Sequence, residues 1–165
     1  MSLVVKLRLI FIITFVSVAI DQVSKLWADR YLIHFTMNSY WGDIVRIGYV
    51  ENHGAFLGLG SSLSESLRFW IFVVAVGLVL LTLLIYMFKS KQQTTYSLTC
   101  LALIFSGGIS NFYDRAMNNG AVIDFLNIGI GSLRTGIFNI ADMAIMLGVF
   151  MLLFAKNENN KSQKA

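Results

Sequence analysis

The sequence predicts an all-α membrane protein with four transmembrane helices and a small β-containing extracytoplasmic region between the first and the second helix. Composition is the first support: 56% of the 165 residues are hydrophobic, 13% are charged, and the mean hydropathy is +0.69. A soluble domain of this composition would leave too much apolar surface in water. The second support is that four apolar stretches reach the length needed to cross a bilayer, about 20 residues. Because so few residues remain, residues 1–165 are expected to form a single integral membrane domain.

The first predicted span covers residues 7–28. Lys6 and Arg8 precede its apolar run, as they would precede a secretory signal. The run lacks a small-residue cleavage pattern, however, and a charged pair, Asp21 and Lys25, stands at its far end. We therefore expect this span to be retained in the membrane.

Residues 29–66 separate the first two spans and are more polar. Apolar and polar residues alternate over 43–49, which predicts short strands, and a small sheet lying on the outer membrane surface would fit. A loop anchored by its aromatic residues fits equally well. In either structure, the aromatic side chains suit contact with lipid headgroups: Tyr31, Phe35, Tyr40, Trp41 and Phe56.

The other predicted spans cover residues 67–88, 96–113 and 137–155. The second span is the clearest of the four, because its run WIFVVAVGLVLLTLLIYMF has no charged side chain. The third span carries small and polar residues in its second half. Gly107 and Gly108 in that half are expected to allow close helix packing.

Basic residues mark the predicted cytoplasmic side. They lie in short segments beside the span ends, and dense Lys and Arg at such positions identify the cytoplasmic face: Lys6, Arg8, Lys89, Lys91, Lys156, Lys161 and Lys164. Both termini are then cytoplasmic, and the two longer connections lie outside. These basic ends beside anionic lipid explain the formal charge of +4, so no nucleic-acid partner is predicted.

Two carboxylates, Asp124 and Asp142, stand at the outer edges of apolar segments and close one short loop. An acid near the bilayer is costly unless it is paired or used, so we interpret them as a catalytic pair. Two neighbouring carboxylates share a proton, and one can activate water while the other donates to a carbonyl. The single cysteine, Cys100, and two histidines, His34 and His53, predict neither an internal disulfide nor a metal site.

Five short motifs follow one another along the chain: Asp21 to Lys25 (DQVSK), Asn52 to Ala55 (NHGA), Gly107 to Arg115 (GGISNFYDR), Val122 to Phe125 (VIDF) and Phe138 to Asp142 (FNIAD). Each motif alone is weak. In their order and spacing, over essentially the whole chain, they resemble the lipoprotein signal peptidase family, also called signal peptidase II.

The resemblance implies an aspartic endopeptidase of the bacterial inner membrane, with its site near the extracytoplasmic face. That family removes the signal peptide from diacylglyceryl-modified prolipoproteins and cuts before the lipidated cysteine. The resemblance implies Asp124 and Asp142 as catalytic residues, no metal or other cofactor, membrane lipid as the surroundings, and a monomer. Other motif positions would bind substrate or support the site, namely Asn52, Gly54, Asn111, Arg115 and Asn139, or have structural roles, namely Asp21, Lys25 and Asp114.

Several of these residues also have a purely structural interpretation. Asn139 and Asp142 have the spacing of a helix capping box. That role is compatible with catalysis, because a capped helix start fixes the position of the carboxylate. Two ion pairs are expected near the span ends: Asp21 with Lys25, four residues apart on a helix surface, and Asp114 with Arg115.

Four positions depart from the family pattern: Phe56, Ser110, Ile137 and Met143. None of them removes a carboxylate, so they affect the expected substrate range more than the reaction. Two other classes stay open from the sequence alone. One is a non-catalytic relative that binds lipoproteins, and the other is a small proton-coupled transporter that uses the acids as a relay.

Overall fold

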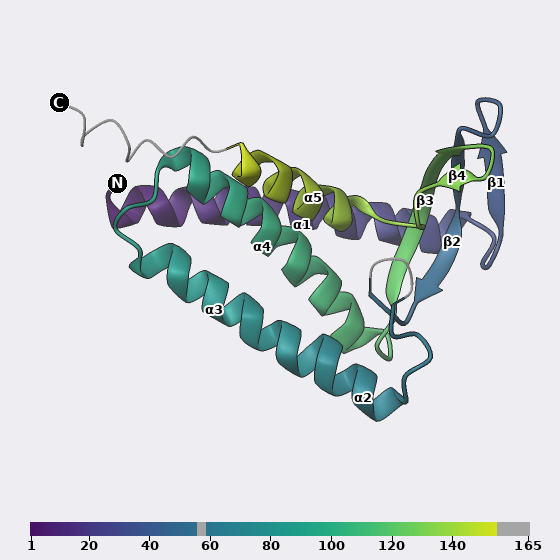
Figure 1. The fold of residues 1–165 in the computed structure, drawn as a ribbon, viewed down its shortest axis with the longest axis horizontal. Coiled ribbons are helices and arrows are strands. Elements are labelled where there is room, and N and C mark those ends of the chain that lie inside the picture. Colours follow the sequence, from purple (N-terminus) through teal and green to yellow (C-terminus); the bar gives the residue numbers. More distant parts are fainter. Residues whose placement is uncertain (56–58, 155–165) are drawn as a thin grey trace.

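The computed structural model describes residues 1–55 and 59–154. These residues form mostly helices, with one small antiparallel sheet at the end of the molecule away from the N terminus (Figure 1). The helices are α1 (Leu3–Tyr31), α2 (Glu65–Phe69), the π-helical η2 (Trp70–Ala75), α3 (Val76–Lys89), α4 (Thr95–Met117) and α5 (Ile140–Leu153). The strands are β1 (Met37–Tyr40), β2 (Val45–Asn52), β3 (Val122–Ile130) and β4 (Leu133–Arg134).

Two helical stretches in the described part of the chain are long and apolar enough to cross a membrane. They are α1, with 29 residues, and the continuous stretch α2–η2–α3, Glu65–Lys89, with 25 residues. Only 11% of the apolar window in each is buried. Neither stretch is therefore the core helix of a soluble protein, which would be covered by its neighbours.

The helices at the third and fourth predicted spans differ in extent from the prediction. α4 begins after the N-cap Thr94 and continues to Met117, beyond the predicted end at residue 113. α5 begins at Ile140 and not at residue 137, because Asn139 caps it. Its 14 residues rise about 21 Å, less than the roughly 30 Å of a bilayer core. The predicted end of this span, residue 155, lies outside the described residues.

The sheet has the strand order β1-β2-β3-β4 and is antiparallel throughout. The strand predicted within residues 43–49 is confirmed by β2. The prediction was wrong about the extent of the sheet, since β3 and β4 lie between α4 and α5, where only a loop was expected. The β-branched run of β3 finds its backbone partners on β2, far away in the sequence, and Asp124 lies opposite Val50 in that pairing.

Glycines permit the closest helix contacts. A Cβ atom on Gly107 of α4 would lie 2.2 Å from the carbonyl oxygen of Ala141 in α5. One on Gly148 of α5 would lie 2.6 Å from the carbonyl oxygen of Cys100 in α4. Such contacts leave no room for a side chain, so α4 and α5 pack backbone to backbone. A Cβ atom on Gly108 would lie 2.6 Å from a side-chain carbon of Leu80 in α3, so both glycines of the third span permit close packing, as predicted.

A buried lysine, Lys6, connects α1 to the end of α3, on the side of the molecule opposite the sheet. Lys6 of α1 donates hydrogen bonds to the carbonyl oxygens of Met87 and Ser90 and to the side chain of Gln93. A cation at the C terminus of a helix is favoured by the helix dipole. Lys6, one of the basic residues that predict the cytoplasmic side, therefore also caps α3.

Candidate active site

Asp124 lies on β3, where the sheet meets the helices, and its side chain is 2% exposed. Asn52, at the end of β2, pairs with Val122, and its Nδ2 donates to Asp124 Oδ2 at 2.9 Å. Asn139 Nδ2 donates to Asp124 Oδ1 at 2.6 Å. Both oxygens of this buried carboxyl group are thus bonded to neutral amides.

Asp142 is held by the first turn of α5. Asn139 Oδ1 accepts from the backbone N–H of Asp142 at 2.9 Å, and Asp142 Oδ2 accepts from the backbone N–H of Asn139 at 3.2 Å. The predicted capping box is therefore confirmed. Asn111 of α4 donates from Nδ2 to Asp142 Oδ1 at 2.9 Å. The cap holds this carboxylate at a helix N terminus, where negative charge is favoured.

Asn139 contacts both acids, Asp124 and Asp142, which we call the carboxylate pair. Burial is the main reason that the pKa of Asp124 is raised, to about 7; the hydrogen bond from Asn52 lowers it, and the charge of Asp142 raises it. Two neighbouring acids in such surroundings keep one proton between them near neutral pH. General acid–base hydrolysis of a peptide needs such a half-protonated pair.

A second polar group, the charged cluster of Asp21, Lys25 and Asp114, lies next to the carboxylate pair. Lys25 Nζ is 2.7 Å from a carboxylate oxygen of each acid, and the three side chains are between 1% and 2% exposed. The predicted ion pair of Asp21 with Lys25 is confirmed, but its predicted place on the helix surface was wrong, because α4 covers the pair and supplies a second acid. An ion pair of Asp114 with Arg115 was predicted. In the described residues Asp114 pairs with Lys25 instead.

Asn111 connects the charged cluster to the carboxylate pair. Lys25 donates to Asn111 Oδ1 at 2.8 Å, while Asn111 Nδ2 donates to Asp142. Asp21 reaches the start of α5, where it accepts from the backbone N–H of Ala141 at 2.8 Å. The charged cluster therefore fixes α1, α4 and α5 around the carboxylate pair.

Arg115 is directed to the turn that follows β2. Its Nη2 donates to the carbonyl oxygen of Gly54 at 2.7 Å, and its guanidinium lies 5.3 Å from the ring centre of Phe72 in η2. The backbone N–H of Gly54 donates to Asn52 Oδ1 at 2.9 Å. Arg115 thus supports Asp124 indirectly, by holding the turn that carries Asn52.

Two contributors to the charged cluster were not predicted as such: Gln22 was missed, and Ser110 was named only as a departure from the family pattern. Ser110 Oγ donates to Asp21 at 2.7 Å. Gln22 Nε2 donates to Ser110 at 3.0 Å and to Asp114 at 2.8 Å. Helix periodicity could have found Gln22, because it stands three residues before Lys25 and so on the same face of α1.

The four residues that depart from the family pattern lie in different parts of the molecule. Ser110 adds a hydroxyl donor to the charged cluster. Ile137 lines a cavity beside Asp124. Met143 is exposed on α5, and Phe56 lies outside the described residues. None of the three described departures disturbs the contacts of the carboxylate pair.

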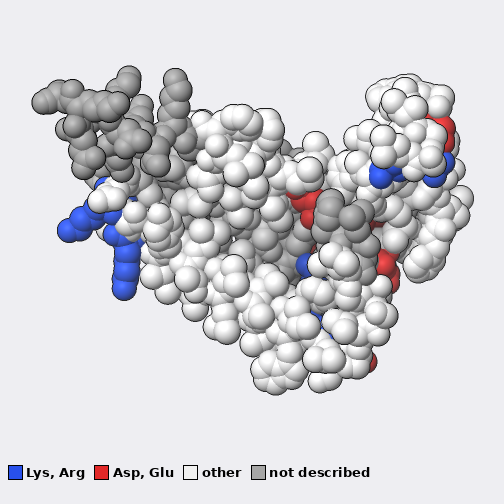
Figure 2. Space-filling view, viewed as in Figure 1, with Lys and Arg blue, Asp and Glu red and all other residues white. Residues whose placement is uncertain are grey.

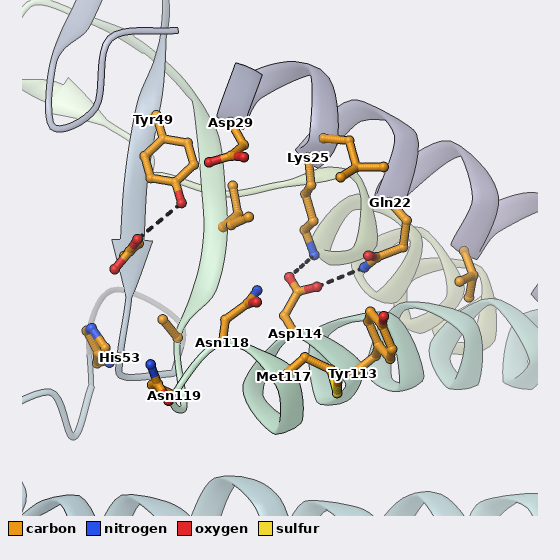
Figure 3. Close-up of a pocket in the computed structure, with 15 residues that line it drawn as sticks. Gln22, Lys25, Asp29, Tyr49, His53, Tyr113, Asp114, Met117, Asn118 and Asn119 are labelled. Atoms are coloured by element: carbon orange, nitrogen blue, oxygen red, sulfur yellow. Dashed lines mark hydrogen bonds and ion pairs between the residues drawn. The ribbon is translucent and has the colours of Figure 1, made fainter. Parts of the chain in front are cut away.

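Two cavities adjoin these groups. One, of about 420 Å³, is lined by Asn52 and Asp124, so space for a ligand lies directly beside Asp124. The other, of about 850 Å³, lies between α1, the end of α4 and the sheet, and Lys25 and Asp114 form part of its wall (Figure 3). The larger cavity therefore borders the charged cluster, and the smaller one borders Asp124 of the carboxylate pair.

The fold and the site together define a class of protein. It is a membrane protein of long apolar helices with a small sheet across one end, and it holds two acids between neutral amides where sheet and helices meet.

Known proteins similar to the chain identify its family. The family model for signal peptidase (SPase) II matches residues 13–156. The lipoprotein signal peptidases of Streptococcus agalactiae and Borrelia hermsii are 31% and 34% identical, each over 90% of this chain and over 93% and 91% of their own lengths. Two solved bacterial membrane enzymes have TM-scores of 0.78 and 0.73 at 26% and 25% identity, over 94% and 91% of this chain and 91% and 93% of theirs. The chain belongs to the signal peptidase II family of membrane aspartic peptidases, as its motifs predicted.

Proposed function

We propose that the chain is the endopeptidase that removes the signal peptide from diacylglyceryl-modified prolipoproteins, cutting before the lipidated cysteine. The observation that carries this proposal is the placement of Asp124 and Asp142 on two sides of Asn139, with amide donors on both acids. The names of the relatives, lipoprotein signal peptidases, support the substrate class.

In the proposed reaction Asp124 is the acid and Asp142 is the base. Asp124, with a pKa of about 7, donates its proton to the carbonyl oxygen of the scissile peptide. Asp142 takes a proton from water, and the resulting hydroxide adds to the carbonyl carbon. The C–N bond then breaks as Asp142 passes its proton to the leaving amine, while Asp124 recovers a proton from a hydroxyl of the intermediate. The signal peptide leaves with a new carboxyl group, and no acyl-enzyme forms.

The other motif residues position this pair in the proposed site. Asn52 and Asn111 each hold one carboxyl group. Gly54 and Arg115 hold the turn that carries Asn52. The charged cluster fixes the three helices that surround the pair, so its role is structural.

We further propose a single domain that crosses the membrane four times, through α1, α2–η2–α3, α4 and α5, with both termini in the cytoplasm. Lys and Arg gather at the end of the helices that carries the N terminus, which supports this orientation (Figure 2). α5 is short for a span. In this arrangement its first turn lies at the outer edge of the hydrocarbon core, where a lipidated cysteine would also lie. The chain acts as a monomer surrounded by lipid.

Cleavage of a diacylglyceryl-modified prolipoprotein by the purified protein tests the proposal. The parent is expected to cut before the modified cysteine, and Asp124→Asn and Asp142→Asn are each expected to lower the rate by about 10³-fold. Asp43→Asn, which changes an acid in the turn between β1 and β2, outside the site, serves as the matched control and is expected to cleave normally.

Two results would contradict the proposal and select an alternative. A parent protein that binds the lipidated substrate without cutting it would be a non-catalytic relative. Proton uptake coupled to solute movement in liposomes, lost in the Asp124→Asn variant, would identify a transporter.

A further inference from the structure

The cavity beside Asp124 has two further charged side chains in its wall, one of each sign. Glu51 of β2 and Arg68 of α2 both line this cavity of about 420 Å³. Glu51 directly precedes Asn52, the residue that bonds to Asp124. Neither Glu51 nor Arg68 belongs to the five motifs of the family, and neither has a role in the proposed reaction. Their presence at the cavity therefore needs a separate explanation.

Glu51 and Arg68 are each held by a residue that precedes them in the sequence. The hydroxyl group of Tyr49 donates to Glu51 Oε1 at 3.1 Å. Arg68 Nη1 donates to the carbonyl oxygen of Ser61 at 3.2 Å. No ion pair joins Glu51 to Arg68 within the part of the chain that the structure describes. Because these opposite charges share one cavity without pairing, each of them can attract an ion of the opposite sign.

The other cations near the carboxylate pair already have partners. Arg115 donates to the carbonyl oxygen of Gly54, and Lys25 lies between the two acids of the charged cluster. Among the described residues that line the cavity beside Asp124, Arg68 is the one arginine or lysine. An anionic group in this cavity therefore meets Arg68.

Glu51 lies between the cavity beside Asp124 and the larger cavity, because it lines both of them. The larger cavity has two more acids in its wall, Asp29 and Asp114 (Figure 3). Asp114 is compensated by Lys25, whereas the side chain of Asp29 is 49% exposed. A cation at Glu51 therefore has further negative charge beside it, on the side of the larger cavity.

Hydrolysis of a peptide bond forms two ions from one neutral group. The C–N bond breaks, the oxygen of water joins the carbonyl carbon, and both protons of water end on the nitrogen. Near neutral pH the signal peptide then ends in a carboxylate, and the lipidated cysteine begins with an ammonium group. The carboxylate forms beside Asp124 and Asp142, where like charges repel it.

We propose that Arg68 binds the carboxylate of the released signal peptide and Glu51 binds the ammonium group of the lipidated cysteine, so that the two products separate by charge. This inference rests on the proposed function, because that reaction forms the two ions. A guanidinium suits a carboxylate, since it can donate two parallel hydrogen bonds to it. The scissile group of an uncleaved substrate is neutral and gains neither interaction, so both residues act after the bond has broken.

Binding of matched product pairs tests the proposal without a cleavage step. One pair is a peptide with the sequence of the C-terminal half of a signal peptide, ending in a carboxylate or in an amide. The other pair is a diacylglyceryl-cysteine peptide whose α-amino group is free or acetylated. In nanodiscs, the parent is expected to bind the charged member of each pair about fivefold more tightly. Equal binding of the two members of either pair would overturn the proposal.

Substitutions assign each preference to its residue. Arg68→Gln should abolish the preference for the carboxylate and keep that for the ammonium group, and Glu51→Gln should do the reverse. Arg30→Gln and Glu65→Gln are the matched controls, because they remove the same charges from exposed residues that do not line the cavity. Both controls should keep both preferences. A carboxylate preference that survives in Arg68→Gln would count against the proposal.

Inhibition of cleavage by the signal-peptide product gives a second measurement. The carboxylate peptide should inhibit the parent about fivefold more strongly than the amide peptide, and the two should inhibit Arg68→Gln equally. The rate of the first turnover should not change, because the uncleaved substrate carries neither ion. A parent that cleaves but binds the members of a pair equally loses only this inference, whereas a parent that does not cleave loses the proposed function itself.

Discussion

Asp124 of the carboxylate pair and all three residues of the charged cluster are buried, and Asp142 is half-buried, yet the two groups balance their charge differently. In the charged cluster one lysine lies 2.7 Å from each of two acids. In the carboxylate pair the acids receive hydrogen bonds from amide groups, which carry no compensating charge. A cation among buried acids suits a structural role, because removing it is costly. Acids with amide partners keep a transferable proton, which suits acid–base chemistry. Burial alone therefore does not distinguish the two; the charge of the partners does.

Removal of the cation from the charged cluster should give the largest change in stability. Lys25→Met leaves Asp21 and Asp114 buried without compensation, and we expect the free energy of unfolding to fall by about 3–5 kcal/mol. Unfolding in mixed micelles, followed by circular dichroism, measures it. Lys6→Met is the control, because it removes a buried lysine that meets neutral acceptors. If the two variants lose the same stability, charge compensation is not what distinguishes the cluster.

Asp124→Asn should change the pH dependence of stability. The pKa of Asp124 is raised from 3.8 to about 7 in the folded chain, so its contribution to stability is fully present below about pH 4 and is lost as pH rises through 7. The variant lacks this loss, and its stability relative to the parent should grow by on the order of 2–4 kcal/mol between pH 4 and pH 8. Unfolding at a series of pH values measures it.

Asp43→Asn is the control for that series, because the stability contributed by Asp43 changes with pH in the opposite direction to that of Asp124. Arg46 lowers the pKa of Asp43, so this acid contributes stability above its unfolded pKa and loses it as pH falls. A parent whose stability does not decline relative to Asp124→Asn as pH rises would show that Asp124 is not an uncompensated buried acid.

Asn111→Leu should affect both groups, since Asn111 bonds to Lys25 and to Asp142. Loss of a hydrogen bond to a charged group costs about 1.5–3 kcal/mol, so kcat/KM should fall about 10- to 100-fold. Steady-state cleavage of the lipidated substrate measures it, with Asn118→Leu, an exposed residue at the end of α4, as the control. A variant that loses stability but keeps its kcat/KM would assign Asn111 to the charged cluster alone.

The smallest expected effect is a shift in the pH profile of cleavage. The rate is expected to fall as pH rises through about 7, because Asp124 then loses the proton that it donates. Asn52→Ala removes a hydrogen bond that lowers this pKa, so the alkaline limb should move upward by up to about one unit. Asn38→Ala, on the exposed strand β1, is the control. An alkaline limb that stays in place or moves down would exclude Asp124 as the donor.

Features that depend on nearby residues could be predicted from the sequence. Asn139 and Asp142 are three residues apart, and their capping box was predicted and is present. The packing role of Gly107 and Gly108 was likewise evident from small residues in an apolar helix. The helix position of Lys25 was predicted as well, but its burial was not, because a helix does not reveal from its own sequence which neighbour covers it.

Contacts between distant segments required the tertiary structure. Asn52 and Asp124 are 72 positions apart, and Lys25 and Asn111 are 86 apart. The strand β3 was taken for a loop because its pairing partner, β2, is separated from it in the sequence by the helical stretch α2–η2–α3 and by α4.

By itself the sequence determined the membrane class, the apolar stretches, the two acids and the family, because composition, local periodicity and motif spacing are properties of neighbouring residues. Only the tertiary structure decided which buried acids are compensated by a cation and which are not. That distinction depends on the distance from each acid to side chains of other helices and strands, since electrostatic interactions and desolvation act through space and not along the chain.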